Sequence, residues 1–267
     1  MHCDFHLHTA FSADCEVPAE EMVKAAVKNG LDILCLTDHM DMDFPYPKVV
    51  FDLDTEAYYK EYLRLRDLYQ KQLDLRFGVE LGLQEHLAKE HTDYVNQYPF
   101  DFVIGSIHLV NRIDPWYPDY FEDRSDEEAF TEYFRALYDN VKAFHDYDVL
   151  GHLDYIVRYS PNKNANYSYE KYKDLIDPTL ELIVSQGIGL EVNTGSIKSG
   201  LDTTNPVPEI LTRYRQMGGE IITLGSDAHN PKYVGFHLKE MQALLKSLGF
   251  THFTVFKERK PQMVPIE

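Results

Sequence analysis

The sequence predicts an α/β protein in which parallel strands alternate with helices and close into a barrel. Three observations support this fold class. The chain has 267 residues, a normal length for one barrel of this kind. Seven short apolar runs are spaced along it, each about the length of a buried strand. Helical patterns separate these runs, and strand–helix alternation is typical of a parallel sheet. Seven such units favour a TIM-like (β/α)7 barrel, with a doubly wound open sheet as the structural alternative.

The predicted strands are rich in Val, Ile, Leu and Phe, as expected for strands buried on both faces. In chain order they are residues 3–8, 31–39, 75–82, 102–108, 148–154, 188–194 and 220–229. No Gly-rich loop of the GxGxxG or GxxxxGK type follows any of them, so nucleotide binding through such a loop has no support. We expect one domain that spans residues 1–267.

The predicted helices carry recognisable start and stop residues. Residues 17–30 have Pro18 near their start and Gly30 at their end, both typical of helix termini. Ser125 is followed three positions later by Glu128, which is a capping-box pattern for a helix over residues 125–144. Further helices are predicted at residues 54–73, 168–187, 205–219 and 234–249, and a weaker one at 85–98.

Composition and charge narrow the function classes. Hydrophobic residues make up 44% of the chain, and no apolar stretch reaches the roughly 18 residues of a membrane helix. The N-terminus has no basic region followed by an apolar one, so we expect no secretory signal. A formal net charge of −18 argues against binding to nucleic acid or to an anionic membrane. The three cysteines form no CxxC pair, and we expect reduced thiols in a cytoplasmic protein.

Each apolar run ends in residues that can bind a metal ion or polarise a substrate. In a parallel barrel the carboxyl ends of all strands lie at one face, so these side chains should converge. His6 and His8 stand two positions apart on a strand and point the same way, and Asp227 and His229 have the same spacing. The candidate metal ligands are His6, His8, Asp14, His39, Glu80, His108, His152, Asp227 and His229. One zinc ion takes about four ligands, so this set implies two or three ions, with Glu80 able to bridge two of them.

A simpler interpretation applies to each histidine alone, because a single histidine at a strand end is more often hydrogen-bonded than metal-bound. Six histidines at predicted strand ends are a much stronger signal. Glu80 lies inside an apolar run, where an unpaired carboxylate is costly to bury and a cation beside it is favoured. The remaining histidines, which we expect at the surface, are His2, His86, His91, His145, His237 and His252.

The motifs HxHT, SxD, TDH, a lone Glu on the third strand, GSIH, GHLD and SDAH, in this order, resemble the polymerase-and-histidinol-phosphatase (PHP) superfamily of metal-dependent phosphoesterases. The resemblance runs from residue 6 to about residue 235. It implies a distorted (β/α)7 barrel that holds three divalent metal ions. One ion would be held by His6, His8, Glu80 and Asp227, a second by Glu80, His108 and His152, and a third by Asp14, His39 and His229.

Within the superfamily, the segments FSAD, GSIHLVN, GHLDYIVRY and EVNTGSIKSG are similar to those of histidinol-phosphate phosphatases. This likeness implies hydrolysis of a small phosphate monoester, L-histidinol phosphate, to L-histidinol and phosphate. Clustered cations would neutralise the ester and lower the pKa of a bound water toward ~7, so we expect in-line attack by a metal-bridging hydroxide. The catalytic candidates are Glu80, Asp227 and Arg158. Asp38 and Asp154, close to proposed ligand histidines, would orient imidazoles or act on the substrate.

Phosphate also needs fixed hydrogen-bond donors. Arg158 is the first candidate, because a guanidinium fork matches phosphate. Lys198 and Ser196 come next, and the alternative for each is an ordinary exposed loop residue. Residues 110–126 supply Trp116 and form either a specificity loop or a surface Ω-loop. The substrate-binding candidates are therefore Arg158, Lys198, Ser196, Asn193 and Trp116.

Several alternatives stay open. A superfamily member that acts on nucleotides, DNA 3′ ends or phosphotyrosine would fit the same ligands. A metal-dependent amidohydrolase also begins with HxH but typically uses a bridging Lys, and no Lys lies at the predicted strand ends. A degenerate metal-binding module would lack ligands, and none is missing. Mixed nitrogen and oxygen donors suit zinc, iron or manganese alike, and the sequence does not predict an oligomeric state.

Overall fold

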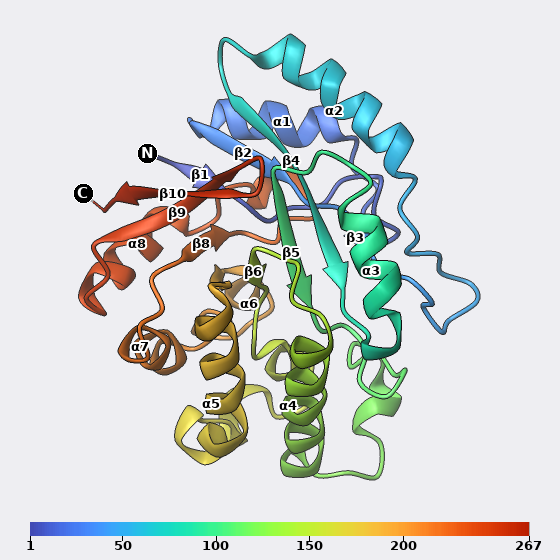
Figure 1. Cartoon of the computed structure of the whole chain (residues 1–267), viewed down its shortest axis with the longest axis vertical. Helices are drawn as coiled ribbons and strands as arrows, with labels where there is room; N and C mark the ends of the chain where they lie inside the picture. The colour runs from blue at the N-terminus through green and yellow to red at the C-terminus, as the bar shows by residue number, and fades with distance from the viewer. Residues whose placement is uncertain (267) are drawn as a thin grey trace.

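The computed structural model describes residues 1–266, in which strands alternate with helices along the chain (Figure 1). The strands are β1 (Cys3–Asp4), β2 (Ile33–Leu36), β3 (His39–Met40), β4 (Asp74–Gly82), β5 (Phe102–Ser106), β6 (Val149–Leu150), β7 (Gly189–Asn193), β8 (Ile222–Gly225), β9 (His252–Lys257) and β10 (Lys260–Pro265). The helices are α1 (Ala19–Lys28), α2 (Thr55–Tyr69), α3 (Ala88–Val95), α4 (Asp126–Ala143), α5 (Tyr169–Gln186), α6 (Gly195–Lys198), α7 (Pro208–Gln216) and α8 (Leu238–Ser247). Short 3-10 turns lie at Glu85–Leu87, Pro118–Phe121, Tyr155–Arg158, Lys163–Asn166 and Pro231–Tyr233.

The central sheet curves into a nearly closed barrel, with helices around it (Figure 1). Its strands pair in the order β1-β2-β4-β5-β6-β7-β8, and the short β3 also pairs with β4. All of these pairings are parallel. The two ends of the sheet meet where Leu7 forms a parallel bridge with Ala228 and the Phe5 N–H donates to the Leu224 carbonyl at 2.9 Å. The predicted barrel of parallel strands is therefore confirmed.

Local sequence signals explain where the long helices begin and end. α1 follows Pro18, and Gly30 just after it has a φ of 71°, a conformation that glycine adopts without strain. At the start of α4, the Ser125 hydroxyl accepts from the Glu128 N–H, and the Glu128 carboxylate accepts from the Ser125 N–H. This predicted capping box satisfies N–H groups that the first helical turn leaves without partners.

The end of the chain differs from the sequence-based expectation, because β9 and β10 form an antiparallel hairpin. The residues at its turn, Glu258 and Arg259, have φ values of 50° and 60°. Turns of this kind usually carry Asn-Gly or Asp-Gly, and this sequence lacks that signal. The hairpin packs against β8, where the Thr254 hydroxyl accepts from the Ile222 N–H at 3.2 Å. It therefore extends the core beyond the predicted elements.

The weaker helix predicted at residues 85–98 contains a 3-10 turn followed by α3. His91 on α3 is fully buried, so its expected surface position is wrong. Its ring packs edge-on against Phe144, with centroids 5.2 Å apart, and neither ring nitrogen has a hydrogen-bond partner among residues 1–266. Burial lowers the pKa of His91 to about 4, against the opposing effect of the nearby Asp41 and Glu90 carboxylates. His91 shares the buried face of α3 with Tyr94 and Val95, so the helix turns it inward.

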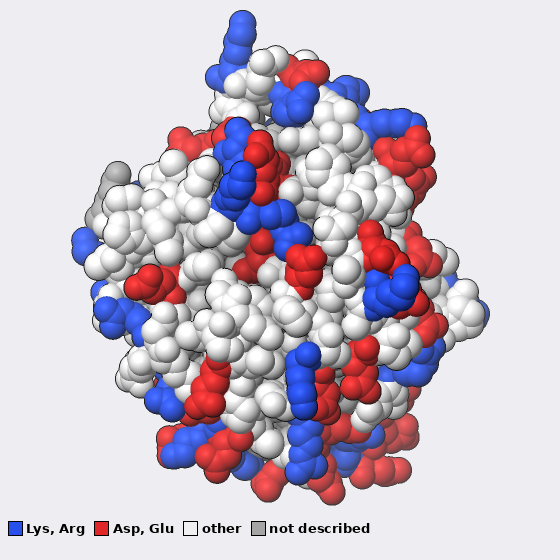
Figure 2. All heavy atoms as spheres, viewed as in Figure 1, with Lys and Arg blue, Asp and Glu red and all other residues white. Residues whose placement is uncertain are grey.

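Acidic and basic side chains are interspersed over the face of the molecule seen in Figure 2. Several form exposed ion pairs, such as Lys60 with Glu56 along α2 and Arg64 with Glu20 between α2 and α1. Exposed pairs of this kind each contribute little to stability. Among the described residues, no helix is long and apolar enough to cross a membrane.

Candidate metal centre

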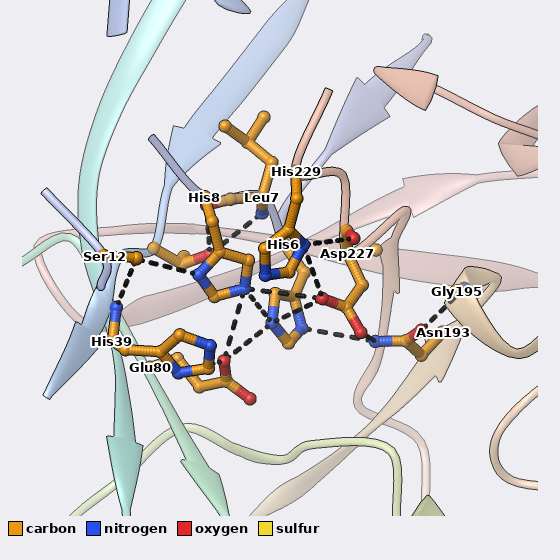
Figure 3. A network of polar contacts seen from close by, with 12 residues as sticks. His6, Leu7, His8, Ser12, His39, Glu80, Asn193, Gly195, Asp227 and His229 are labelled. Carbon is orange, nitrogen blue, oxygen red and sulfur yellow. Dashed lines mark hydrogen bonds and ion pairs between the residues drawn. The ribbon is translucent and has the colours of Figure 1, made fainter. Parts of the chain in front are cut away.

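The side chains predicted to converge lie together at the carboxyl ends of the barrel strands. Figure 3 labels six of them: His6, His8, His39, Glu80, Asp227 and His229. They come from β3 and β4 and from the segments that follow β1, β5, β6 and β8. The cluster contains His6, His8, Asp14, His39, Glu80, His108, His152, Asp227 and His229. Parallel pairing explains the convergence, since it places the carboxyl ends of distant segments at one face.

The first group of donor atoms comes from His6, His8, Glu80 and Asp227. The Nε2 atoms of His6 and His8 lie 3.2 Å apart, and Oε2 of Glu80 lies 3.0 and 3.4 Å from them. Oδ1 of Asp227 lies 3.9 Å from Nε2 of His6 and 3.4 Å from Nε2 of His8. Ligands about 2.1 Å from a tetrahedral zinc ion stand roughly 3.4 Å apart, which agrees with these separations.

Glu80 divides its two oxygens between this group and a second one. Oε1 lies 3.2 Å from Nε2 of His108 and 2.8 Å from Nε2 of His152, whereas Oε2 faces the first group. The Ser106 hydroxyl donates to Oε1 at 2.6 Å and holds the carboxylate in place. One buried carboxylate thus faces two sets of imidazole nitrogens, as a bridging ligand does.

The third group is the most exposed of the three. Oδ2 of Asp14 lies 3.0 Å from Nε2 of His229 and 3.6 Å from Nε2 of His39. The ring of His8 stacks on those of His39 and His229, with centroids 4.1 and 4.2 Å apart. These stacked rings connect the third group to the first.

The arrangement of lone pairs and carboxylates favours positive charge between the donor atoms of the cluster. Nδ1 of His6 lies 2.6 Å from Glu191, so a neutral His6 that donates there presents a lone pair on Nε2 to Glu80. Oε2 of Glu80 is buried and has no hydrogen-bond donor among residues 1–266. Burial alone would raise the pKa of Glu80, but His6 and His108 hold it well below its usual range. Burial alone would lower the pKa of His6, but Glu191 and Glu80 raise it well above its usual range. These residues therefore fit divalent metal ions.

Asp227 is held in an unusual backbone conformation. Its φ is 53°, in the left-handed region that costs free energy for residues other than glycine. The carboxylate accepts from Nη1 of Arg158 at 2.6 Å, and the carbonyl accepts from Nζ of Lys198 at 2.9 Å. Burial would raise the pKa of Asp227, but the guanidinium of Arg158 and the ring of His6 hold it well below its usual range. An ionised carboxylate is thus fixed beside His6 and His8.

An open pocket of about 490 Å³ adjoins the cluster. Phe44, Trp116 and Tyr155 give it aromatic walls. Asp114 adds a carboxyl group, and burial raises its pKa to about 6. The pocket therefore combines a cation-binding floor with an aromatic and acidic rim.

The predicted substrate-binding residues fall into two sets. Arg158, Lys198 and Trp116 line the pocket. Asn193 and Ser196 are buried behind it: Oδ1 of Asn193 accepts from Nη2 of Arg158 at 2.6 Å, and the Ser196 hydroxyl donates to a backbone carbonyl at 2.6 Å. Their positions favour a role in supporting the site over direct contact with a substrate.

Three other polar residues that are not among the predicted metal ligands reach the site, and one of them, Glu191, lies in the sixth predicted strand. Oδ1 of Asp41 lies 2.9 Å from Nδ1 of His108, and Glu191 contacts His6. Oδ1 of Asn205 accepts from Nε of Arg158 at 2.6 Å. The signal that marks Glu80, a carboxylate inside an apolar run, applies equally to Glu191.

The aspartates expected near imidazoles have other partners. Asp38 accepts from the Thr9 N–H at 2.6 Å and from the Ser12 hydroxyl at 2.7 Å. Asp154 accepts from the Asn205 side chain and from the Val207 N–H, at 2.5 and 3.0 Å. Both carboxylates therefore brace loops around the site.

Comparison with known proteins shows the family to which the chain belongs. The PHP domain family model matches residues 4–195, and the chain belongs to this family. It is 30% identical to the histidinol-phosphatase of Lactococcus lactis subsp. lactis (strain IL1403) over 258 residues, which cover 96% of this chain and 95% of that protein. It is 35% identical to the probable histidinol-phosphatase of Clostridium acetobutylicum over 237 residues, which cover 88% of this chain and 89% of that protein.

A solved structure has the same fold. The crystal structure of histidinol phosphate phosphatase from Lactococcus lactis, complexed with zinc, L-histidinol and phosphate, superposes with a TM-score of 0.88. It is 28% identical in sequence, and the match covers 98% of each chain. The whole barrel is therefore shared with a phosphatase that binds zinc.

Proposed function

We propose that this chain is a metal-dependent phosphomonoesterase that hydrolyses L-histidinol phosphate to L-histidinol and phosphate. The observation that carries this proposal is the shared use of Glu80 by two sets of imidazole nitrogens at the floor of an open pocket. The likeness to a structure that contains zinc, L-histidinol and phosphate supports the choice of substrate.

Three divalent ions would occupy the cluster in this proposal. His6, His8, Glu80 and Asp227 would hold the first, Glu80, His108 and His152 the second, and Asp14, His39 and His229 the third. When bound, such ions supply positive charge to the phosphate and lower the pKa of water. Zinc fits these nitrogen and oxygen donors, and so do iron and manganese.

The chain's own residues would bind and orient the ester. Arg158 and Lys198 line the pocket with cationic groups that suit the phosphate. Asp114 and Trp116 on the rim suit the amine and the imidazole of L-histidinol, because a carboxylate attracts the first and an aromatic face packs on the second. Glu80 and Asp227 would act by fixing the ions beside the phosphate.

A cytoplasmic location belongs to the same proposal. Cys3, Cys15 and Cys35 are buried and carry free thiols, which suits a reducing compartment. Burial raises the pKa of the Cys15 thiol to about 11, so this group stays protonated and unreactive near neutral pH. The proposed partner is a small phosphate monoester.

A phosphate-release assay tests the substrate after the metal content of the purified protein has been measured. It compares L-histidinol phosphate with mononucleotides, a phosphotyrosine peptide and a generic aryl phosphate. We expect strong preference for L-histidinol phosphate, loss of activity on chelation, and recovery when zinc is returned. Metal-dependent activity on only the other esters would support the metal site but show that the substrate is a nucleotide or phosphotyrosine instead.

A further inference from the structure

Two histidines of the cluster have one ring nitrogen against a buried carboxylate. Nδ1 of His6 lies 2.6 Å from Oε1 of Glu191, and Nδ1 of His108 lies 2.9 Å from Oδ1 of Asp41. The two acids are only 1% and 3% exposed. In each ring the other nitrogen, Nε2, faces Glu80 at 3.0 or 3.2 Å. Each imidazole therefore stands between its own carboxylate and the shared one.

Each of the two groups that share Glu80 contains one of these histidine–carboxylate pairs, His6 with Glu191 in the first and His108 with Asp41 in the second. His6 faces Oε2 of Glu80, and His108 faces Oε1. His8 differs, because its Nδ1 lies 3.2 Å from the uncharged hydroxyl of Ser12. One histidine in each group thus has a charged partner.

Glycines at the ends of two strands leave the space that these carboxylates occupy. A Cβ on Gly225, the last residue of β8, would lie 2.2 Å from Oε1 of Glu191. A Cβ on Gly82, the last residue of β4, would lie 1.5 Å from Oδ1 of Asp41. Neither glycine has a positive φ, so each is needed for close approach and not for its backbone conformation.

Glu191 is itself held by further contacts. Its Oε2 accepts from the His152 N–H at 2.8 Å and from Nδ2 of Asn193 at 3.1 Å. These bonds fix the carboxylate, so that Oε1 points at His6. The bond from the His152 N–H also connects the second group to the first, because Glu191 is the partner of His6.

We propose that Glu191 and Asp41 are positioning residues of the metal centre. Each accepts the Nδ1 proton of its histidine, which leaves the lone pair on Nε2 and fixes the plane of the ring. Their negative charge strengthens the imidazole as a donor to a cation. The inference rests on the proposed metal site and adds the residues that prepare two of its ligands.

The test compares Glu191→Ala, Glu191→Gln, Asp41→Ala and Asp41→Asn with the wild-type chain. Asp101→Asn is the buried control, because Asp101 is 9% exposed and accepts from the Phe77 and Glu258 N–H groups at the opposite end of the barrel. One measurement is the zinc retained per chain over a series of free zinc concentrations set by a chelator. The other is the visible spectrum of the cobalt-loaded protein, with circular dichroism as the check on folding.

We expect the free zinc needed for half-occupancy to rise about 10–100-fold in the alanine variants. Gln and Asn keep an acceptor oxygen, so their variants should lose less affinity, and Asp101→Asn should match the wild type. The cobalt spectrum should change in the Glu191 and Asp41 variants and stay unchanged in Asp101→Asn. Gly225→Ala should weaken zinc binding at least as much as Glu191→Ala does, because the added Cβ would lie 2.2 Å from Oε1 of Glu191 and 2.4 Å from Cβ of His6.

Folded alanine variants with unchanged zinc retention and an unchanged cobalt spectrum would overturn the inference. If an alanine variant does not fold, unchanged zinc retention and an unchanged cobalt spectrum in the corresponding Gln or Asn variant would overturn the inference. A wild-type chain that retains no zinc, iron or manganese would instead remove the metal centre itself, and with it the proposed function.

Discussion

The guanidinium of Arg158 and the carboxylate of Asp227 form a buried ion pair, with Nη1 2.6 Å from Oδ2. Nε and Nη2 of Arg158 donate to the side-chain oxygens of Asn205 and Asn193, each at 2.6 Å. A guanidinium has about five N–H groups, so these contacts leave roughly two for an anion in the pocket. Arg158 can therefore hold Asp227 and bind phosphate at the same time.

Arg158→Ala should lower kcat/KM by about 100-fold or more, because removing one fixed donor that stabilises charge in the transition state typically costs about 100- to 1,000-fold. Zinc retention should fall with it, since Asp227 loses the group that fixes its carboxylate. Steady-state kinetics and metal analysis on the same preparation measure both effects. Lys198→Ala is the comparison variant, for which we expect a smaller effect. A rise in KM alone, with kcat and zinc content preserved, would restrict Arg158 to binding phosphate.

His8→Ala and Asp227→Ala should each abolish turnover and lower the bound metal. Both residues supply donor atoms to the first group, and Asp227 contributes the oxygen 3.4 Å from Nε2 of His8. Metal analysis and phosphate release on the purified variants measure the loss. His145→Ala is the matched control, because His145 is exposed and lies outside the cluster. Full activity in the His8 variant would contradict the metal site.

Trp116→Ala should raise KM for L-histidinol phosphate about fivefold, since an aromatic contact is worth about 1 kcal/mol. Trp116 is 60% exposed at the rim of the pocket, and its ring packs edge-on against Tyr117, with centroids 4.8 Å apart. Zinc content and kcat should stay at the wild-type level. Leu68→Ala, which removes an exposed apolar side chain on α2, is the control. An unchanged KM would mean that residues 110–126 form a surface Ω-loop without a role in specificity.

The cluster could be predicted from the sequence because position on a parallel strand fixes where a side chain points. The two-residue spacing of His6 and His8, repeated by Asp227 and His229, places each pair on one side of its predicted strand. In the structure β1 and β8 end before these residues, but the parallel bridge between Leu7 and Ala228 keeps the two segments paired. Parallel pairing then carries both pairs to the same face of the barrel.

The partners of the ligands could not be predicted in the same way. Asp38 and Asp41 lie within two residues of His39, yet Asp38 braces Thr9 and Ser12 while Asp41 reaches His108. Sequence spacing does not distinguish them, because the choice depends on how the segment after β2 bends. The β9–β10 hairpin escapes prediction for a related reason, since its turn lacks the usual residues.

His91 makes the stability of the protein sensitive to acid. Burial lowers its pKa from 6.5 to about 4, so the folded chain favours the neutral ring. The contribution is fully present above pH 6.5 and is lost as the pH falls from 6.5 toward about 4. The whole shift corresponds to at most about 3 kcal/mol.

His91→Phe should therefore reduce the loss of stability on acidification, whatever its effect at neutral pH. Urea unfolding of the metal-free protein near pH 7 and at about pH 4.5 measures the free energy of unfolding under both conditions. The metal-free form is used because release of bound ions at low pH would also change the stability. The residues of the cluster titrate alike in the wild type and in His91→Phe, so their effect cancels. We expect the variant to lose about 2 kcal/mol less than the wild type between the two conditions. An equal loss in both chains would show that the buried ring takes up its proton without cost, through a partner that forms on protonation.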